Sequence, residues 1–494
     1  MTNATDLHAG VARAAVTPPT GMRLAGSLRD TLSTEVHDEL SVSALYLREG
    51  PRTALIITCD LILMPPEDAL QIREAVAAAL RIEAADVLLS FSHSHATPSP
   101  ISWGEHDYVA TIEERQAVVK YFDRLTTAII GTARSAAEQA QLARVAAGSG
   151  ESAININRRE RRADGAMLLG SNPDGAVDRE VRVVRIDTDQ GTPLAMLMNY
   201  ACHPDVLGPK SSLISPDFVG PARAAAEAVT GSTALYLQGA AGDIYPCSGI
   251  VNGDAGLDVA IRLGRQLGAE AARVHETLNT VRRPSERLEW ISTNSITTNW
   301  NYEDLDRPTS PQLATASIVL DLPTRPLPPE KEAEEVVATR ERELVVVPET
   351  APLSARLIAN RRLAWARIQL NAIREELAPT VPVELQAVRI GSAALIAIPG
   401  ELFTEIGLAI KAASPFEHTL VCAYSNGVYF YIPTKAAFED GGYEVNSHMN
   451  YLRPSGPTAD WEAILVEQAT RLLDGLYRTA PHQQQLKGKH QCIE

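Results

Sequence analysis

The sequence predicts an α/β fold, and two observations support that prediction. Short apolar runs bounded by turn-forming residues, which are typical of buried strands, alternate along the chain with longer segments of strong helix formers. Of the 494 residues, 45% are hydrophobic and 21% are charged, which is the ordinary balance of a globular protein with a large core. We find no internal repeat.

The N-terminal segment reads as β structure, because the apolar runs 40–47 and 53–59 are bounded by turn-forming residues. Residues 69–80 are strong helix formers, and Pro65-Pro66-Glu67-Asp68 before them is an N-terminal helix signal. The short apolar run 86–91 predicts a buried strand.

The middle of the chain continues the alternation. Residues 113–140 predict a long amphipathic helix. The runs 181–186 and 194–200 predict a strand pair, because Asp187-Thr188-Asp189-Gln190-Gly191 between them is a turn signal. The remaining predicted elements of this part are helices at 218–229 and 255–278 and a strand at 233–237.

A Pro- and Glu-rich region over 323–352 differs in composition from its surroundings, and its core, 330–343, reads as an exposed helix. This insert is either a lid or an oligomer contact, and the sequence favours neither. The elements predicted after it are helices at 352–377, 402–412 and 458–477 and two short strands within 385–398. The polar tail, 481–494, is predicted to be disordered.

Composition and charge exclude several function classes. The formal net charge of -16 disfavours nucleic acid and anionic membrane surfaces as partners. No run approaches the roughly 18 apolar residues of a membrane span, and residues 1–14 lack the apolar core of a signal peptide. The cysteines are odd in number and form no C-x-x-C pair. We therefore expect a reduced, cytoplasmic protein that acts on a small molecule, with self-association into a homo-oligomer left open.

Residues able to bind a metal stand next to several predicted strands. His93 and His95 follow the strand at 86–91, His203 follows the run 194–200, and Glu401 closes the later strand pair. The carboxyl ends of strands are where α/β sheets bind ligands. With the phenols of Tyr431 and Tyr443, these side chains make up the ligand set of an open, hydrolytic zinc site.

Each of these residues also has a purely structural interpretation. A lone His-x-His pair is most often a polar loop, and His203 alone is most often a hydrogen-bonded structural histidine. Glu401 could complement the dipole of the helix predicted after it. The two tyrosines could be packing residues, and Asp243 in its Gly-Asp turn an Asx turn. The ordered set is stronger than any single motif, and it favours an enzyme.

The ordered motifs resemble the catalytic domain of the neutral, non-lysosomal ceramidases, from about residue 8 to residue 450. Five segments carry this resemblance. Ser92-His93-Ser94-His95-Ala96-Thr97-Pro98 is similar to the family's T-H-T-H-S-x-P-G segment, and Ile156-Asn157-Arg158 is similar to its I-N-R-S segment. Ser215-Pro216-Asp217 is similar to S-G-D, Pro399-Gly400-Glu401 to P-G-E, and the segment from Ser425 to Tyr431 to S-N-x-Y-x-x-Y. The family places a second functional tyrosine 12 residues after its zinc-binding tyrosine, and Tyr443 stands 12 residues after Tyr431.

The resemblance implies a single α/β catalytic domain over 1–480, with mixed β-sheets flanked by helices. It implies amide hydrolysis as the reaction and Zn²⁺ as the cofactor. The zinc ligands implied are His93, His203, Glu401 and Tyr431. The residues implied to line the site and contact the substrate carbonyl or the oxyanion are His95, Arg158 and Tyr443.

Three departures from the family pattern bear on the substrate. Tyr245 stands where the family has a catalytic serine, so a seryl intermediate is impossible at this position. The family's T-x-E-E-Y stretch reads Thr434-Lys435-Ala436-Ala437-Phe438. The chain also has no room for the family's C-terminal immunoglobulin-like domain. These departures argue against ceramide itself and for a small soluble substrate.

We therefore predict a zinc-dependent hydrolase that cleaves an amide C–N bond with a metal-activated water. Arg158, Tyr443 and Tyr245 are the candidates for stabilising the oxyanion, and either His95 or Asp243 would shuttle protons. Two alternatives remain open: a zinc-dependent esterase or lactonase, and a catalytically inactive homologue that binds a metal or ligand.

Overall fold

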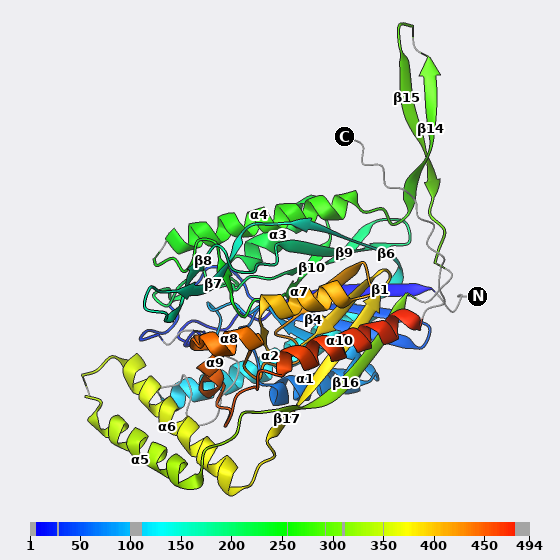
Figure 1. Ribbon diagram of the computed structural model, residues 1–494. Coiled ribbons are helices and arrows are strands. Elements are labelled where there is room, and N and C mark those ends of the chain that lie inside the picture. Colours follow the sequence, from blue (N-terminus) through cyan, green and yellow to red (C-terminus); the bar gives the residue numbers. More distant parts are fainter. Residues whose placement is uncertain are drawn as a thin grey trace.

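The computed structural model describes residues 6–26, 29–98, 111–253, 255–291, 293–308, 312–348 and 350–479. The predicted disordered tail lies outside the described residues. Within them the chain builds an eight-stranded mixed sheet, a second sheet of four strands, several two- and three-stranded pieces and flanking helices, so the predicted α/β fold is confirmed (Figure 1). No described helix has the length and apolar character to cross a bilayer.

The eight-stranded sheet is the larger of the two main sheets. In spatial order its strands are β12 (Thr233–Gln238), β10 (Pro193–Tyr200), β9 (Glu180–Thr188), β6 (Gln141–Glu151), β1 (Leu7–Ala15), β3 (Ser41–Glu49), β4 (Arg52–Cys59) and β5 (Val87–Phe91). The sheet curves so that its edge strands, β5 and β12, contact each other. Gln238 links the two edges, because its Nε2 donates to the carbonyls of Cys202 at 2.7 Å and Ser92 at 3.4 Å.

Side chains alternate between the two faces of this sheet, and both faces are buried. On one face Leu55 and Ile57 pack beneath α1 (Pro66–Leu80) and α2 (Ile112–Glu138). On the other face Ile56 packs against residues of the second sheet. Burial on both faces explains why these strands read in the sequence as continuous apolar runs.

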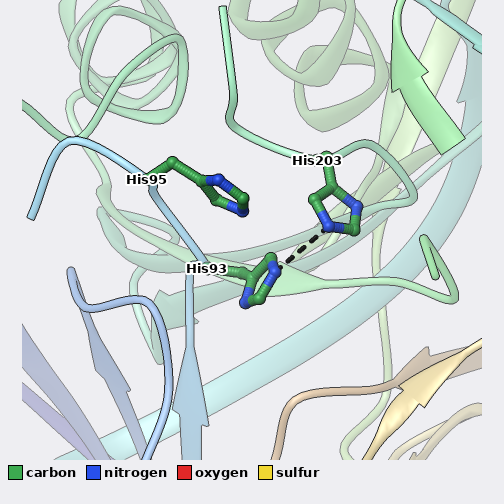
Figure 2. Close-up of side chains that lie close together, drawn as sticks. All are labelled: His93, His95 and His203. Carbon is green, nitrogen blue, oxygen red and sulfur yellow. Dashed lines mark hydrogen bonds between the residues drawn. The ribbon is translucent and has the colours of Figure 1, made fainter. Parts of the chain in front are cut away.

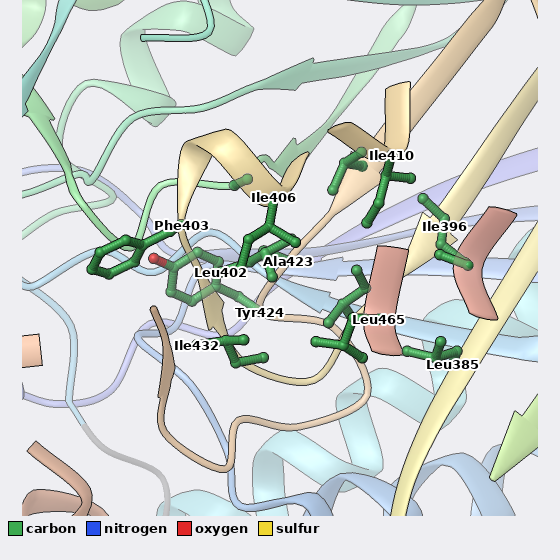
Figure 3. Packing of buried hydrophobic residues seen from close by; sticks show 14 of the residues in the cluster. Leu385, Ile396, Leu402, Phe403, Ile406, Ile410, Ala423, Tyr424, Ile432 and Leu465 are labelled. Atoms are coloured by element: carbon green, nitrogen blue, oxygen red, sulfur yellow. The ribbon is translucent and has the colours of Figure 1, made fainter. Parts of the chain in front are cut away.

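The second sheet closes the other side of this core. Its strands, in spatial order, are β16 (Leu313–Pro323), β17 (Thr380–Ile390), β18 (Ala393–Ala397) and β20 (His418–Cys422). Helices α7 (Thr404–Ala413) and α10 (Trp461–Arg478) cover its outer face, where Ile406 and Leu465 join one apolar cluster with Ile396 (Figure 3). The outer end of the first sheet is covered by α3 (Val219–Thr230) and α4 (Ala255–Thr277).

Most predicted elements are confirmed to within a few residues, including the long helices α2 and α4 and the strand pair β9–β10. The predicted exposed helix of the insert is α5 (Glu330–Val346), which pairs with α6 (Leu353–Arg374). The smaller elements are β2 (Glu35–Val36), β7 (Asn155–Arg161), β8 (Met167–Asn172), β11 (Leu213–Ile214), β13 (Ile244–Pro246), β14 (Arg282–Ile291), β15 (Ile296–Asp304), β19 (Glu401–Leu402), β21 (Tyr431–Ile432), α8 (Lys435–Asp440), α9 (Tyr443–Asn446) and the 3-10 helices η1 (Ala84–Asp86) and η3 (Ser447–Tyr451).

The helix-dipole interpretation of Glu401 was wrong. Glu401 does not adjoin the start of the next helix, because its backbone pairs with Tyr431 in the two-stranded parallel ladder β19–β21, and α7 begins only at Thr404. The ladder places Glu401 and Tyr431 side by side in register. Glu401 is therefore not available to complement a helix dipole, and its carboxylate lies among buried polar side chains instead.

Candidate functional site

Two buried imidazoles meet where the edges of the large sheet come together (Figure 2). His93 follows β5 and His203 follows β10. The Nδ1 atom of His93 lies 2.7 Å from the carbonyl oxygen of Ile62, and that of His203 lies 2.6 Å from the carbonyl oxygen of Ala241. Since a carbonyl can only accept, each Nδ1 donates its proton to that carbonyl, and each Nε2 is left to face the other groups of the site.

The Nε2 atoms of the two histidines face each other and a carboxylate oxygen. The Nε2 atoms are 3.1 Å apart, and Glu401 Oε2 lies 3.3 Å from His93 Nε2 and 3.4 Å from His203 Nε2. A tetrahedral zinc ion with ligands at about 2.0 Å separates neighbouring ligand atoms by about 3.3 Å. The three atoms thus fit one face of a zinc coordination tetrahedron.

The electrostatics of this triangle call for a cation. Burial and the nearby Arg158 lower the pKa of His203 to about 3, so this imidazole is neutral at physiological pH. Burial acts to raise the pKa of Glu401, but the neighbouring His93 and His203 hold it well below its ordinary value. Three buried acceptor atoms pointing at one another repel unless a proton or a metal ion lies between them. Arg158 supplies part of the positive charge, because its Nη1 donates to His203 Nε2 at 3.3 Å.

Two tyrosines that the sequence did not identify hold the carboxylate. Tyr424 donates its hydroxyl proton to Glu401 Oε2 at 3.3 Å, and its ring stacks on His93 with centroids 4.2 Å apart. Tyr451 donates to the other oxygen, Oε1. Tyr424 directly precedes the recognised Ser425 motif, which is the one signal that could have identified it; Tyr451 belongs to no motif.

Arg158, the arginine of the Ile156-Asn157-Arg158 motif, is a buried cation beside these side chains. Its Nη2 donates to the Tyr431 hydroxyl at 3.0 Å, and its Nε donates to Glu444 Oε1 at 3.1 Å. Burial opposes its charge, but Tyr431 and Glu444 raise the pKa of the guanidinium well above its ordinary value. Glu444, which also accepts from Arg159 at 2.7 Å, was not identified from the sequence.

Tyr431 and Tyr443 lie next to each other, with ring centroids 5.7 Å apart. Tyr431 is buried beside Glu401, whereas 43% of the surface of Tyr443 is exposed. Asn450 donates to the Tyr443 hydroxyl at 3.2 Å. Tyr443 therefore stands at the mouth of the site and Tyr431 at its base.

Tyr245 and Asp243 belong to the wall behind Arg158. The Tyr245 ring lies under the guanidinium, 4.7 Å from its carbon to the ring centroid, and meets the His203 ring edge to face at 6.0 Å. Asp243 accepts from Asn157 Nδ2 at 3.0 Å and from the Thr404 backbone N–H at 2.8 Å. Burial raises the pKa of Asp243 to about 6. Both of its oxygens are thus occupied by groups that brace the loop.

His95 reaches the same cavity as His93, although the chain turns between them. Residues two apart on an extended segment share one face, but His93 adopts a left-handed backbone with φ of 67°. One ligand atom each of His93, His95 and His203 lie within 4.8 Å of one another, so this cluster could hold a metal ion. His95 Nδ1 lies 3.3 Å from Asp205 Oδ2. Burial and Asp217 raise the pKa of Asp205 to about 8.

These side chains border a small cavity of about 50 Å³. Its polar wall is formed by His93, His95, Glu401, Tyr431, Tyr443, Asn450 and Tyr451. Its apolar wall is formed by Ala25, Gly26, Ile62 and Leu63. Arg158, Tyr245, Asp243 and His203 are not among the residues that border it. The predicted set is therefore assembled in one place but divided between the cavity wall and the layer behind it.

Comparison with known proteins gives a likeness at the level of structure only. No protein-family model and no curated protein sequence matches the chain. The crystal structure of neutral ceramidase from Pseudomonas aeruginosa is similar, with a TM-score of 0.64 and 18% identity over 97% of this chain and 76% of that one. A structure described as ceramidase complexed with C2 is similar, with a TM-score of 0.63 and 19% identity over 99% and 78% of the two chains. The protein therefore has a neutral-ceramidase-like α/β fold.

Proposed function

We propose that this protein is a zinc-dependent hydrolase that cleaves an amide C–N bond of a small soluble substrate. The observation that supports it best is the convergence of His93 Nε2, His203 Nε2 and Glu401 Oε2 at separations of 3.1 to 3.4 Å. Two neutral imidazoles and one carboxylate are the protein ligands of several hydrolytic zinc sites. The similarity in fold to proteins named ceramidases favours an amide over other carbonyl substrates.

His93, His203 and Glu401 would hold the ion, with Tyr431 as the fourth protein ligand. Bound zinc lowers the pKa of a water to about 7 and polarises a carbonyl. Burial raises the pKa of Tyr431 well above its ordinary value, while the Arg158 guanidinium 3.0 Å away favours the phenolate. Tyr424 and Tyr451 orient the Glu401 carboxylate, as the outer partners of metal ligands commonly do.

Arg158 would stabilise the negative charge that develops on the carbonyl oxygen. Its side chain is fixed before substrate arrives, because Glu444, Tyr431 and the Tyr245 ring hold it from three sides. A cation held rigidly in a buried site needs no rearrangement as charge develops, and such groups supply the largest share of many rate enhancements. Tyr443 at the mouth would donate to the same oxygen.

The leaving nitrogen needs a proton when the C–N bond breaks, and His95 is the better candidate of the two groups considered. It borders the cavity, and its two ring nitrogens are buried and form no hydrogen bond with the residues that the structure describes, although Nδ1 lies 3.3 Å from Asp205 Oδ2. Asp243 is bonded through both oxygens to Asn157 and Thr404. A water would then add to the carbonyl carbon, and the proton would pass through His95 to the amine.

The cavity supports a small substrate. At about 50 Å³ it holds a few atoms of an acyl group and does not fit a long alkyl chain. Ala25, Ile62 and Leu63 supply an apolar wall for such a group.

Metal analysis is the first test. Purified wild type should contain about one zinc per chain, and Glu401→Ala should lose it. Glu405→Ala is the matched control, because Glu405 is exposed in the first turn of α7 and should leave the zinc content unchanged. Wild type that stays free of transition metal after zinc is supplied would overturn the proposal.

A second candidate function keeps the site and changes the bond to an ester or lactone. The presence of Tyr245 where the similar family has serine favours it, because an easier leaving group depends less on the missing hydroxyl. Matched amide and ester substrates with the same acyl group would separate the two. Binding without turnover of either, in fully metallated protein, would identify an inactive homologue.

A further inference from the structure

A long β-hairpin projects from the body of the protein, far beyond the sheets that form its core (Figure 1). It consists of β14 and β15, which pair only with each other among the described strands. Every residue of both strands is exposed. A two-stranded hairpin is at best marginally stable in water, since three or more strands with an apolar face are needed for independent stability.

The outer half of the hairpin has a composition unlike the rest of the surface. Positions 290–302 contain no Asp, Glu, Lys or Arg, in a chain that is 21% charged. The same stretch exposes Trp290, Ile291, Ile296, Trp300 and Tyr302, with exposed fractions from 47% to 78%. Clustered exposed apolar side chains of this kind mark a surface that meets a partner.

The two free edges of the hairpin differ. The β14 edge carries Pro284, a register irregularity at 284–286 and the charged residues Arg287 and Glu289. These are the features by which edge strands avoid pairing with other chains. The β15 edge has none of them between Ile296 and Tyr302, where the sequence is Ile-Thr-Thr-Asn-Trp-Asn-Tyr. The β15 edge is thus open to another strand.

The pattern along β15 is complementary to itself. If two copies pair antiparallel about a two-fold axis at Asn299, Ile296 lies opposite Tyr302 and Thr298 opposite Trp300, all on one face. Aromatic and β-branched residues in directly opposite positions are stabilising cross-strand pairs. The other face pairs Thr297 with Asn301 and Asn299 with its own copy, and no like charges meet.

We propose that β15 is a homodimerisation edge, which joins two copies of this chain into a continuous four-stranded sheet in the order β14, β15, β15, β14. The same surface on both partners is what a two-fold dimer requires. Four strands remove the marginal stability of the isolated hairpin. A lipid surface fits less well, because Asn299 and Asn301 would enter an apolar layer with their amides unpaired.

Sedimentation velocity on the full chain tests the proposal over roughly 1 to 100 µM, since a contact of this size is expected to be weak. Wild type should pass from monomer to dimer. Asn299→Lys should stay monomeric, because it places two ammonium groups opposite each other at the axis. The matched control is Leu288→Lys, on the directly opposite position of β14, which should still dimerise. Circular dichroism spectra and melting curves recorded near 1 µM, where wild type is monomeric, should be the same for wild type and both variants.

Disulfide trapping tests the register. Opposite residues in an antiparallel pair have Cα atoms about 5 Å apart, which suits a disulfide. In a Cys247→Ser, Cys492→Ser background, Asn299→Cys should form a covalent dimer under mild oxidation, and Leu288→Cys should not. The proposal is overturned by a wild type that stays monomeric throughout, whether or not it binds neutral phosphatidylcholine vesicles. It is also overturned by an Asn299→Lys variant that dimerises.

Discussion

Tyr451 donates its hydroxyl proton to Oε1 of Glu401, the oxygen opposite the one that approaches His93 and His203. This bond links the carboxylate of the candidate metal site to η3, and η3 is itself held by contacts from α6. In α6, Trp365 Nε1 donates to the carbonyl of Arg453 and Gln369 Nε2 to that of Pro454, just beyond η3. Helix α6, which pairs with α5, is therefore connected to the candidate metal site through η3 and Tyr451.

Tyr451→Phe should weaken zinc binding about 10-fold, because outer-shell partners of metal ligands typically contribute 10- to 100-fold in affinity. Competition with a zinc chelator would measure the change. Tyr429→Phe is the matched control: it also removes a buried tyrosine hydroxyl, one that donates to the Pro382 carbonyl away from the site, and should leave zinc affinity unchanged. Equal affinities in the two variants would contradict the role given to Tyr451.

Glu444→Gln should lower both stability and turnover. Arg158 and Arg159 both donate to this carboxylate, and its removal leaves a buried guanidinium without its counter-ion. Breaking a buried ion pair in this way costs about 3–5 kcal/mol in the free energy of unfolding. Urea denaturation would measure it. Asp440→Asn, which breaks the exposed pair with Arg161, should cost less than about 1 kcal/mol.

Tyr245→Ser should lower kcat, although it introduces the serine that the sequence resemblance to the neutral ceramidases suggests for this position. The ring supports Arg158 from below, and its loss frees the guanidinium to move. Tyr245→Phe keeps the ring and should retain most of the activity. Steady-state kinetics on the two variants would decide between packing and hydroxyl chemistry: a large loss in the Phe variant would assign the hydroxyl a direct role.

The stability of the metal-free protein should fall as pH rises from about 4 to 6, in part through Asp217. Burial raises the pKa of this carboxyl to about 6, although the backbone N–H groups of Leu207 and Phe218 donate to it. The unfolded chain releases this proton near pH 4, so the folded state binds more protons between the two values. A shift of this size corresponds to about 3 kcal/mol of lost stability across the window.

Urea denaturation of wild type and Asp217→Asn at a series of pH values would measure this dependence. The difference in stability between the two proteins should change across the window, because the Asn variant cannot take up the proton. The exposed Asp174→Asn variant should follow wild type at every pH. Parallel curves for wild type and Asp217→Asn would show that this carboxyl does not titrate in the window.

Patterns that repeat along the chain predicted the fold well. Helices α1, α2 and α10 were identified from runs of helix formers, and β4 and β5 from apolar runs that are buried on both faces. The hairpin β14–β15 was missed because its strands bury no face and so show no alternation of apolar and polar residues.

Candidate site residues could be predicted only where they belong to a motif. His93, His203 and Glu401 follow recognisable strands or turns, and the structure brings them within 3.4 Å of one another. Glu444 and Tyr451 were missed because a single buried carboxylate or phenol has no sequence signature. Their partners lie about 50 positions or more away along the chain, where only the folded structure brings them close.

The candidate metal ligands come from two different parts of the fold. His93 and His203 follow strands of the first sheet, while Glu401 and Tyr431 come from the short ladder β19–β21 beside the second sheet. Neither part supplies more than two of these four candidate ligands, and the ion would lie between the two sheets. Zinc could then bind tightly only after both sheets have folded and packed together, so tight metal binding would report that both parts of the candidate site have folded.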